Sequence, residues 1–315
     1  MINYDSKNWF EAIGHFKTSY VIRRTMRMCL GAGGYAAMVA VVEHLLEAHP
    51  SFAQLNISMG LEPGIFSLLG VFLSLMLVFR TNTAYDRWWE GRKLWGSLVN
   101  HTRGIAVRWH GLLSREDHTN RVFFARALTA YAKTLSDHLR GQAVPDLLMT
   151  YSGESRATLA GYTHLPNKIA RDIWERGEFL YRDQFIDGFQ YSQVQPEVQH
   201  LLDIHGACER IRATPIPFAH NFFIKLFILA YCSLLPFVLV PVVGYYAILL
   251  TMFVVYALVG LEYISVEIEE PFGTDCNDLP THDMALRIGK QVHEILEVSQ
   301  EETEHEVTRA YIVIS

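Results

Sequence analysis

The sequence predicts an all-α membrane protein with about four transmembrane helices and a helical cytosolic region. Half of its 315 residues are hydrophobic and 19% are charged, against roughly 25% charged in an ordinary soluble domain, so the chain has more apolar surface than one soluble core needs. Four stretches also approach the roughly 20 apolar residues that a helix needs to cross a bilayer. We therefore expect a lipid bilayer to cover part of the apolar surface of this protein.

The four apolar stretches differ in how clearly they predict a span. They cover residues 25–46, 64–79, 222–242 and 245–266. The last two are the clearest. The first contains Arg27, Glu43 and His44, and the second is short, so hydropathy alone leaves open that either is a buried helix of a soluble protein.

The charges that flank these stretches favour membrane spans. Lys and Arg accumulate before the first stretch and after the second, at Lys7, Lys17, Arg23, Arg24, Arg27, Arg80, Arg87, Arg92 and Lys93. Residues 49–63 contain neither, and the connection at 242–245 is uncharged. Since positively charged flanks stay on the cytosolic side, the pattern predicts a multi-pass protein of the cell membrane with both termini and the long middle segment in the cytosol.

The middle segment is expected to consist of packed helices, because 122–139 has helical periodicity. Interruptions are expected at Gly153, Gly161, Pro166 and Gly177, and chain breaks at Pro215 and Pro217. Proline disfavours helix at the residue before it, so the Glu-Glu-Pro-Phe-Gly run at 269–273 should end the fourth span. The expected division is a cytosolic N-terminal segment (1–24), transmembrane helices 1 and 2 (25–80), a cytosolic helical region (81–220), transmembrane helices 3 and 4 (221–268) and a cytosolic C-terminal tail (269–315).

Several function classes are excluded by what the sequence lacks. The net charge is −6 at pH 7 and no basic cluster carries interleaved aromatic residues, so no nucleic-acid partner is expected. No phosphate-binding loop, dinucleotide fingerprint or nucleophile elbow occurs, so we expect neither an enzyme nor a cofactor. The 14 histidines are scattered and no Cys-x-x-Cys pair exists, so no metal site is expected. We interpret the cysteines as small buried hydrophobes, namely Cys29, Cys208, Cys232 and Cys276.

The second span carries a stripe of apolar residues at helical spacing. Val71, Leu75 and Phe79 recur every four residues and therefore lie close to one helix face. Small residues for close helix contact are supplied by Ser67, Gly70 and Ser74. Such a stripe is either a constriction or ordinary core or lipid-facing surface, and the spacing does not choose between them.

Three segments, the first of them directly after this stripe, resemble signatures of the bestrophin family in its bacterial form. The first signature (80–95) includes Arg87-Trp-Trp-Glu, the second (204–217) includes Ile-His-Gly-Ala-Cys-Glu-Arg-Ile and Thr-Pro-Ile-Pro, and the third (270–275) is Glu-Pro-Phe-Gly-Thr-Asp. They occur in the family's order over nearly the whole chain. We assign a structural role to their central residues, Arg87, Trp88, Trp89, Glu90, Pro271 and Gly273. An interfacial aromatic anchor with ordinary helix ion pairs explains the Arg-Trp-Trp-Glu run equally well.

The resemblance implies a homopentamer whose second helices surround one axial pore. A ring is also physically required, because four helices of one subunit leave no room for a water-filled path, whereas a cyclic assembly creates one on its axis. The family's spacing places a hydrophobic neck at Val71, Leu75 and Phe79 and a second, cytosolic aperture at Phe189. Such rings hinder ions by dewetting.

The expected function is the passage of small monovalent ions across the bilayer. Animal members of the family conduct chloride, while some bacterial relatives are sodium-selective, so the resemblance favours an anion channel and leaves a sodium channel as the alternative. A membrane-anchored enzyme or transporter is a more distant alternative. It would use the charged residues near the membrane boundaries, Lys225 and Glu262.

Acidic residues gather after the fourth span and could hold calcium. They are Glu262, Glu267, Glu269, Glu270, Asp275 and Asp278. Calcium-gated family members use consecutive acidic residues after Pro-Phe-Gly, whereas this chain has Thr274, Asp275 and Cys276 there. We therefore expect a solvated acidic helix end with Asp275 or Asn277 as a helix cap, and no activation by calcium.

Overall fold

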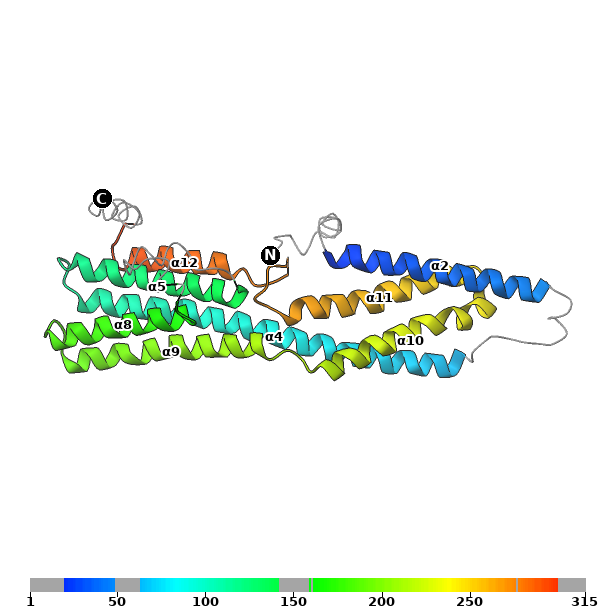
Figure 1. Cartoon of the computed structure of the whole chain (residues 1–315), viewed down its shortest axis with the longest axis horizontal. Helices are drawn as coiled ribbons and strands as arrows, with labels where there is room; N and C mark the ends of the chain where they lie inside the picture. The colour runs from blue at the N-terminus through cyan, green and yellow to red at the C-terminus, as the bar shows by residue number, and fades with distance from the viewer. Residues whose placement is uncertain (1–19, 49–62, 142–158, 160, 276, 300–315) are drawn as a thin grey trace. The chain divides into compact units, whose positions relative to one another are not determined.

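The computed structural model describes residues 20–48, 63–141, 159, 161–275 and 277–299. These residues contain eight longer helices and no strand, which confirms the all-α prediction (Figure 1). The chain divides into two compact units. The first consists of Met1–Trp88, Pro215–Glu270 and Asp275–Asn277, and the second of Trp89–Thr214, Pro271–Thr274 and Asp278–Ser315.

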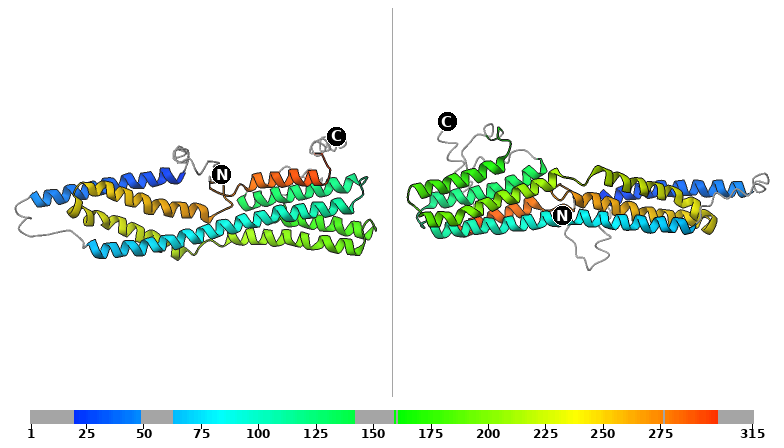
Figure 2. Two further views of the ribbon diagram at one scale, coloured as in Figure 1. Left: turned by 180° about the vertical axis from the view of Figure 1, so that it is seen from behind. Right: turned by 90° about the horizontal axis from the view of Figure 1, so that it is seen from below.

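The first unit contains the four candidate membrane helices. They are α2 (Tyr20–Ala48), the first part of α4 (Pro63–Leu112), α10 (Phe218–Val243) and α11 (Tyr246–Glu269). Each is long and apolar enough to cross a bilayer, so four candidate spans agree with the predicted number of about four. α2 packs along α11, and α10 contacts both (Figures 1 and 2).

The core of the first unit is built from one face of each helix. Leu73 and Leu77 of α4 pack with residues of α2, α10 and α11 in one cluster, namely Cys29, Ile224, Ile228, Val255 and Val259. Gly70 allows a close approach, since a Cβ there would lie 2.7 Å from the Tyr231 hydroxyl. Tyr231 in turn stacks on Phe66 with 4.2 Å between ring centroids. Gly70 is thus a packing residue, as its size predicts.

The helix α4 is longer than the sequence pattern indicated. It runs unbroken for 50 residues, about 75 Å at 1.5 Å per residue, whereas about 30 Å spans the hydrocarbon core. The boundary between the two units falls within it, between Trp88 and Trp89. The apolar stripe and the first signature therefore lie on one continuous helix.

The second unit is a helical bundle. It contains the rest of α4 with α5 (His118–Arg140), α8 (Leu165–Arg182), α9 (Gly188–Ala213) and α12 (Thr281–Ile295). α5 is central, since it is buried on most of its faces and contacts α8, α9 and α12 (Figure 1). Asp117 caps its start by accepting a hydrogen bond from the Asn120 amide, and Gly141 ends it in the left-handed conformation.

Aromatic side chains pack in the core of this bundle, and a glycine that was predicted to interrupt the chain lies among them. Trp109 stacks on Phe124 with 4.1 Å between centroids, and the buried Tyr131 hydroxyl donates to the Leu201 carbonyl at 2.7 Å. Gly177 does not interrupt the chain as predicted but lies inside α8. A Cβ at Gly177 would come within 3.2 Å of Tyr191, so this glycine serves close packing rather than a turn.

The remaining helix boundaries and the burial of the cysteines largely agree with the predictions from the sequence. α9 ends at Ala213, Pro217 is the N-cap of α10, and α11 ends at Glu269. Cys29 and Cys208 are buried and Cys232 is half-buried, all as free thiols. Burial raises the pKa of the Cys208 thiol to about 12, which keeps it unreactive. Cys276 and Gly153 lie outside the described residues.

Candidate functional site

The two faces of α4 in the first unit have opposite environments. Leu73 and Leu77 are each 2% exposed, whereas Val71, Leu75 and Phe79 are 68%, 53% and 60% exposed. Residues two positions apart are separated by about 200° around an α-helix. The predicted neck residues therefore lie on the face of α4 that turns away from the packed helices of their own chain.

This exposure excludes one of the interpretations of the stripe, a place in the core of the chain. Val71, Leu75 and Phe79 do not belong to the core of the chain, so the core reading is wrong. Other apolar residues of α4, such as Leu68 and Phe72, are exposed as well. The exposed face of α4 can therefore contact either lipid or other subunits around a pore.

An ion network is buried beside the stripe, where the first signature begins. Arg80 is 0% exposed, and its Nη2 donates to Glu269 Oε2 at 2.6 Å. Its Nε lies 3.8 Å from Glu262, whose other oxygen lies 3.8 Å from Lys225 Nζ. Glu269 Oε1 also accepts from the Ile216 amide at 2.9 Å. The cation and the carboxylates compensate each other's charge away from water.

The expected solvated acidic end of α11 is therefore wrong for most of its acidic residues. Glu262, Glu267, Glu269 and Asp278 are buried, whereas Glu270 and Asp275 are exposed. Glu262 and Glu269 can leave water because Arg80 lies beside both and the Ile216 amide donates to Glu269. The expected cap is also wrong for α12. Its N-cap is Pro280, with no side-chain cap hydrogen bond, and the sequence could not place the start of that helix.

Within the first unit, the signature residues bind backbone near the end of α11. Arg87 Nε donates to the Glu269 carbonyl at 3.1 Å, and Trp88 Nε1 donates to the Asn277 carbonyl at 3.1 Å. Trp88 also stacks on Tyr85 with 6.1 Å between centroids. These contacts join the first signature to the segments on either side of the third.

Within the second unit, the signatures contact one another. Glu90 and Arg210, of the first and second signatures, form an ion pair at 3.2 Å. A Cβ at Gly91 would lie 3.1 Å from the Phe272 ring of the third signature. The Pro271 carbonyl accepts from the Leu279 amide at 2.9 Å, while Gly273 is half-buried and Trp89 is exposed. The structural role of the six signature residues remains a prediction that these contacts support.

Phe189 lies in the first turn of α9 and is 74% exposed. A capping box holds this turn: the Asp187 side chain accepts from the Gln190 amide, and the Gln190 side chain accepts from the Asp187 amide. The Phe189 carbonyl accepts from the Ser192 hydroxyl. The backbone that carries this ring is thus well anchored, while the ring itself makes few contacts within the chain.

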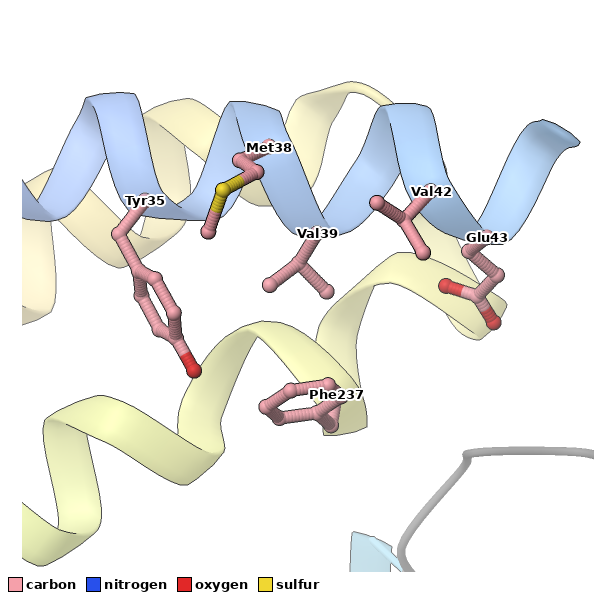
Figure 3. A pocket seen from close by; sticks show the side chains of 6 residues that line it. All are labelled: Tyr35, Met38, Val39, Val42, Glu43 and Phe237. Carbon is pink, nitrogen blue, oxygen red and sulfur yellow. The ribbon is translucent and has the colours of Figure 1, made fainter.

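A small apolar pocket of about 200 Å³ lies between α2 and α10 (Figure 3). It is lined by Tyr35, Met38, Val39, Val42, Glu43 and Phe237. The Tyr35 hydroxyl donates to the Ser233 carbonyl at 3.0 Å, so it is already engaged. The pocket offers no set of converging polar groups of the kind that orients a small-molecule ligand.

These features define a class of protein: a helical integral membrane protein with four candidate spans and an exposed apolar face on its longest helix. The particular family follows from comparison with known proteins. The family model described as Bacterial/Fungal Bestrophin protein matches residues 1–294. The chain belongs to this family, which confirms the resemblance inferred from the three signatures.

Individual relatives and structures agree with this assignment. The chain is 36% identical over 241 residues to a voltage-dependent anion channel-forming protein of Nostoc sp., covering 75% of this chain and 78% of that one. A protein of the same description from Escherichia coli K12 is 29% identical over 281 residues, 89% of each. A crystal structure of a bacterial bestrophin homolog from Klebsiella pneumoniae matches with a TM-score of 0.79 and 25% identity, over 87% of this chain and 99% of that one.

Proposed function

We propose that this chain is one subunit of a homopentameric bestrophin channel that conducts small monovalent anions. The observation that carries the proposal is the exposed apolar stripe on α4, opposite the face that packs against the chain's own helices. In a ring of identical chains, Val71, Leu75 and Phe79 would form stacked hydrophobic rings around the axis. Phe189 would form the second aperture at the cytosolic end.

The membrane helices support assembly into a ring because a single chain buries little of their surface. In the most hydrophobic window of α4 only 22% of the residues are buried, and in the other three helices 28%. Lipid can cover part of the remaining surface, but a water-filled path requires several subunits around an axis. Dewetting of the apolar rings would then gate the path, because an ion there must shed water without a polar substitute.

Anions are proposed as the permeant species because the Nostoc and Escherichia coli relatives carry the description of anion channel-forming proteins. The neck residues themselves carry no charge, so they do not set the sign of the permeant ion. The alternative is a sodium channel of the same fold, and the experiment described below distinguishes it from an anion channel.

A membrane-anchored enzyme or transporter is less well supported. Its candidate residues, Lys225 and Glu262, face each other at 3.8 Å, and Glu262 also lies beside Arg80. An ion network of this kind accounts for both charges without a substrate. We further propose that the protein lies in the cell membrane with both termini in the cytosol, as the basic flanks indicate.

The test is the purified full-length protein in planar lipid bilayers under an NaCl gradient. We expect currents that reverse near the chloride equilibrium potential and an assembled mass of roughly five times the 36.0 kDa chain. Reversal near the sodium potential would replace the anion with the cation proposal. A folded monomer or dimer without currents would contradict the channel itself.

A further inference from the structure

Three histidines and one glutamate of the second unit come together from three helical elements. His138 lies in the last turn of α5, His164 is the N-cap residue of α8, and His205 and Glu209 are one turn apart on α9. One ligand atom from each of the four lies within 4.8 Å of the other three. The sequence separates these residues by up to 71 positions, which is why no ligand spacing is visible in it.

The three histidine nitrogens lie around one oxygen of the Glu209 carboxylate. Glu209 Oε1 lies 2.7 Å from His138 Nε2, 3.5 Å from His164 Nδ1 and 3.2 Å from His205 Nε2. Ligands of a tetrahedral ion with bonds of 2.0–2.1 Å are separated by roughly 3.3 Å. The three separations from Glu209 bracket this value, and every other pair of ligand atoms lies within 4.8 Å. Side-chain rotations would therefore suffice to place all four atoms around one ion.

A second observation points to a ligand at this place. The His205 side chain is 2% exposed, and its Nε2 makes no hydrogen bond although it lies beside Glu209. A buried imidazole nitrogen without a hydrogen bond has a free energy cost. This nitrogen lies within 4.8 Å of the other three ligand atoms, and an ion bound there would satisfy it.

We propose that His138, His164, His205 and Glu209 bind one divalent transition-metal ion of the zinc class. Three nitrogens and one oxygen suit zinc, whereas calcium takes six to eight oxygens. Four protein ligands leave no open position, which is the pattern of structural rather than catalytic zinc sites. The ion would tie the end of α5 and the start of α8 to α9. His164 is about half exposed, so the ion can enter from that side.

The alternative occupant of the cluster is a shared proton. His138 Nε2 and Glu209 Oε1 are already at hydrogen-bond distance, so a protonated histidine could hold the carboxylate without a metal. The two occupants differ in a measurable way, because only the metal site binds Zn²⁺ with defined stoichiometry and responds to removal of His164.

The experiment uses the full-length protein in detergent, stripped with a chelator and titrated with Zn²⁺ against a fluorescent zinc indicator. We expect one tight site per chain and a higher midpoint of thermal unfolding with Zn²⁺. Replacing Zn²⁺ with Co²⁺ should give the visible absorption of a tetrahedral ion. His164→Ala is the main variant, because its exposed side chain contributes little packing, and it should weaken binding more than about 10-fold.

His200→Ala is the matched control, since His200 is an exposed histidine of α9 outside the cluster. It should retain the stoichiometry and affinity of the wild type. His205→Gln, which keeps a buried polar side chain, should also lose the site. Zn²⁺ binding that is absent from the wild type, or unchanged in a folded His164→Ala variant, would overturn the proposal. None of these readouts depends on ion conduction.

Discussion

Arg80 of α4 and Glu269, the last residue of α11, form a buried ion pair of 2.6 Å across 189 positions of the sequence. This pair links the start of the first signature with the residue that precedes the third. Glu269 also binds the Ile216 amide, so the same carboxylate holds part of the second. Within the first unit, one buried carboxylate thus contacts the first and second signatures.

Replacing Arg80 with methionine should destabilise the protein strongly. The substitution leaves Glu262 and Glu269 buried without their cation, and loss of one partner of a buried pair costs about 3–5 kcal/mol. We expect loss of monodisperse protein, or a large fall in the midpoint of thermal unfolding in detergent. Glu270→Gln, at an exposed neighbouring carboxylate, should have little effect. Equal losses in both variants would argue against the pair.

Shrinking the proposed neck to alanine should increase conduction. The Val71→Ala, Leu75→Ala and Phe79→Ala triple variant would let water persist in the constriction, so the cost of stripping an ion of water falls. The measurement is single-channel current and open probability in lipid. Charge preference should change less, because no charged group is altered.

The control for the neck uses the opposite face of the same helix. Leu73→Ala and Leu77→Ala remove packed side chains, and each should cost about 2–5 kcal/mol of stability. The neck variant should keep its thermal stability and assembly, since the residues are exposed in the chain. Wild-type currents from a well-assembled neck variant would show that these residues do not form the constriction.

Currents should not depend on micromolar calcium. The third signature lacks the run of consecutive acidic residues, and several nearby carboxylates are buried with Arg80 or other groups rather than open to solvent. Open probability measured with and without a calcium chelator should therefore agree. A steep increase with calcium that Asp275→Ala abolishes would contradict this prediction.

Cysteine accessibility should follow the proposed topology. In a background without native cysteines, Tyr246→Cys and Leu55→Cys should react with an impermeant reagent from outside, and Ser192→Cys only from the cytosol. Tyr246 is 75% exposed, Ser192 is exposed, and residue 55 lies outside the described residues. Labelling of position 55 from the cytosolic side would change the number of spans.

Acid should destabilise the second unit through His293. Burial lowers the pKa of this imidazole from 6.5, although its hydrogen bond with the Gly289 carbonyl opposes the shift. The unfolded chain therefore takes up the proton first, and stability that is present above about pH 6.5 is lost as the pH falls toward the lower folded pKa.

The measurement is the midpoint of thermal unfolding at about pH 7.5 and pH 5.5. His293→Asn should reduce the difference between the two values, while His200→Asn, at an exposed position, should leave it unchanged. Both variants retain His205, the other buried histidine among the described residues, so its contribution to the pH dependence is the same in each. The same pH dependence in wild type and His293→Asn would exclude this histidine as a cause.

The sequence by itself determined the membrane class, the four spans and the family. Hydropathy and basic flanks depend on the composition of single segments, and signatures such as the Arg87-Trp-Trp-Glu run are contiguous. The start of α10 after Pro217 and the end of α11 at Glu269, shortly before Pro271, were also predictable, because proline restricts the local backbone. The sequence could not distinguish an interrupting glycine from Gly177, whose small size serves a contact with Tyr191.

Only the tertiary structure decided which groups meet. Periodicity placed Val71, Leu75 and Phe79 on one face of a helix, but contacts from α2, α10 and α11 decided that Leu73 and Leu77 form the packed face instead. Burial of Glu262 and Glu269 likewise depended on Arg80, which is distant in sequence. The histidine cluster has the same origin, since a site assembled from three helical elements depends on their packing and leaves no local pattern in the chain.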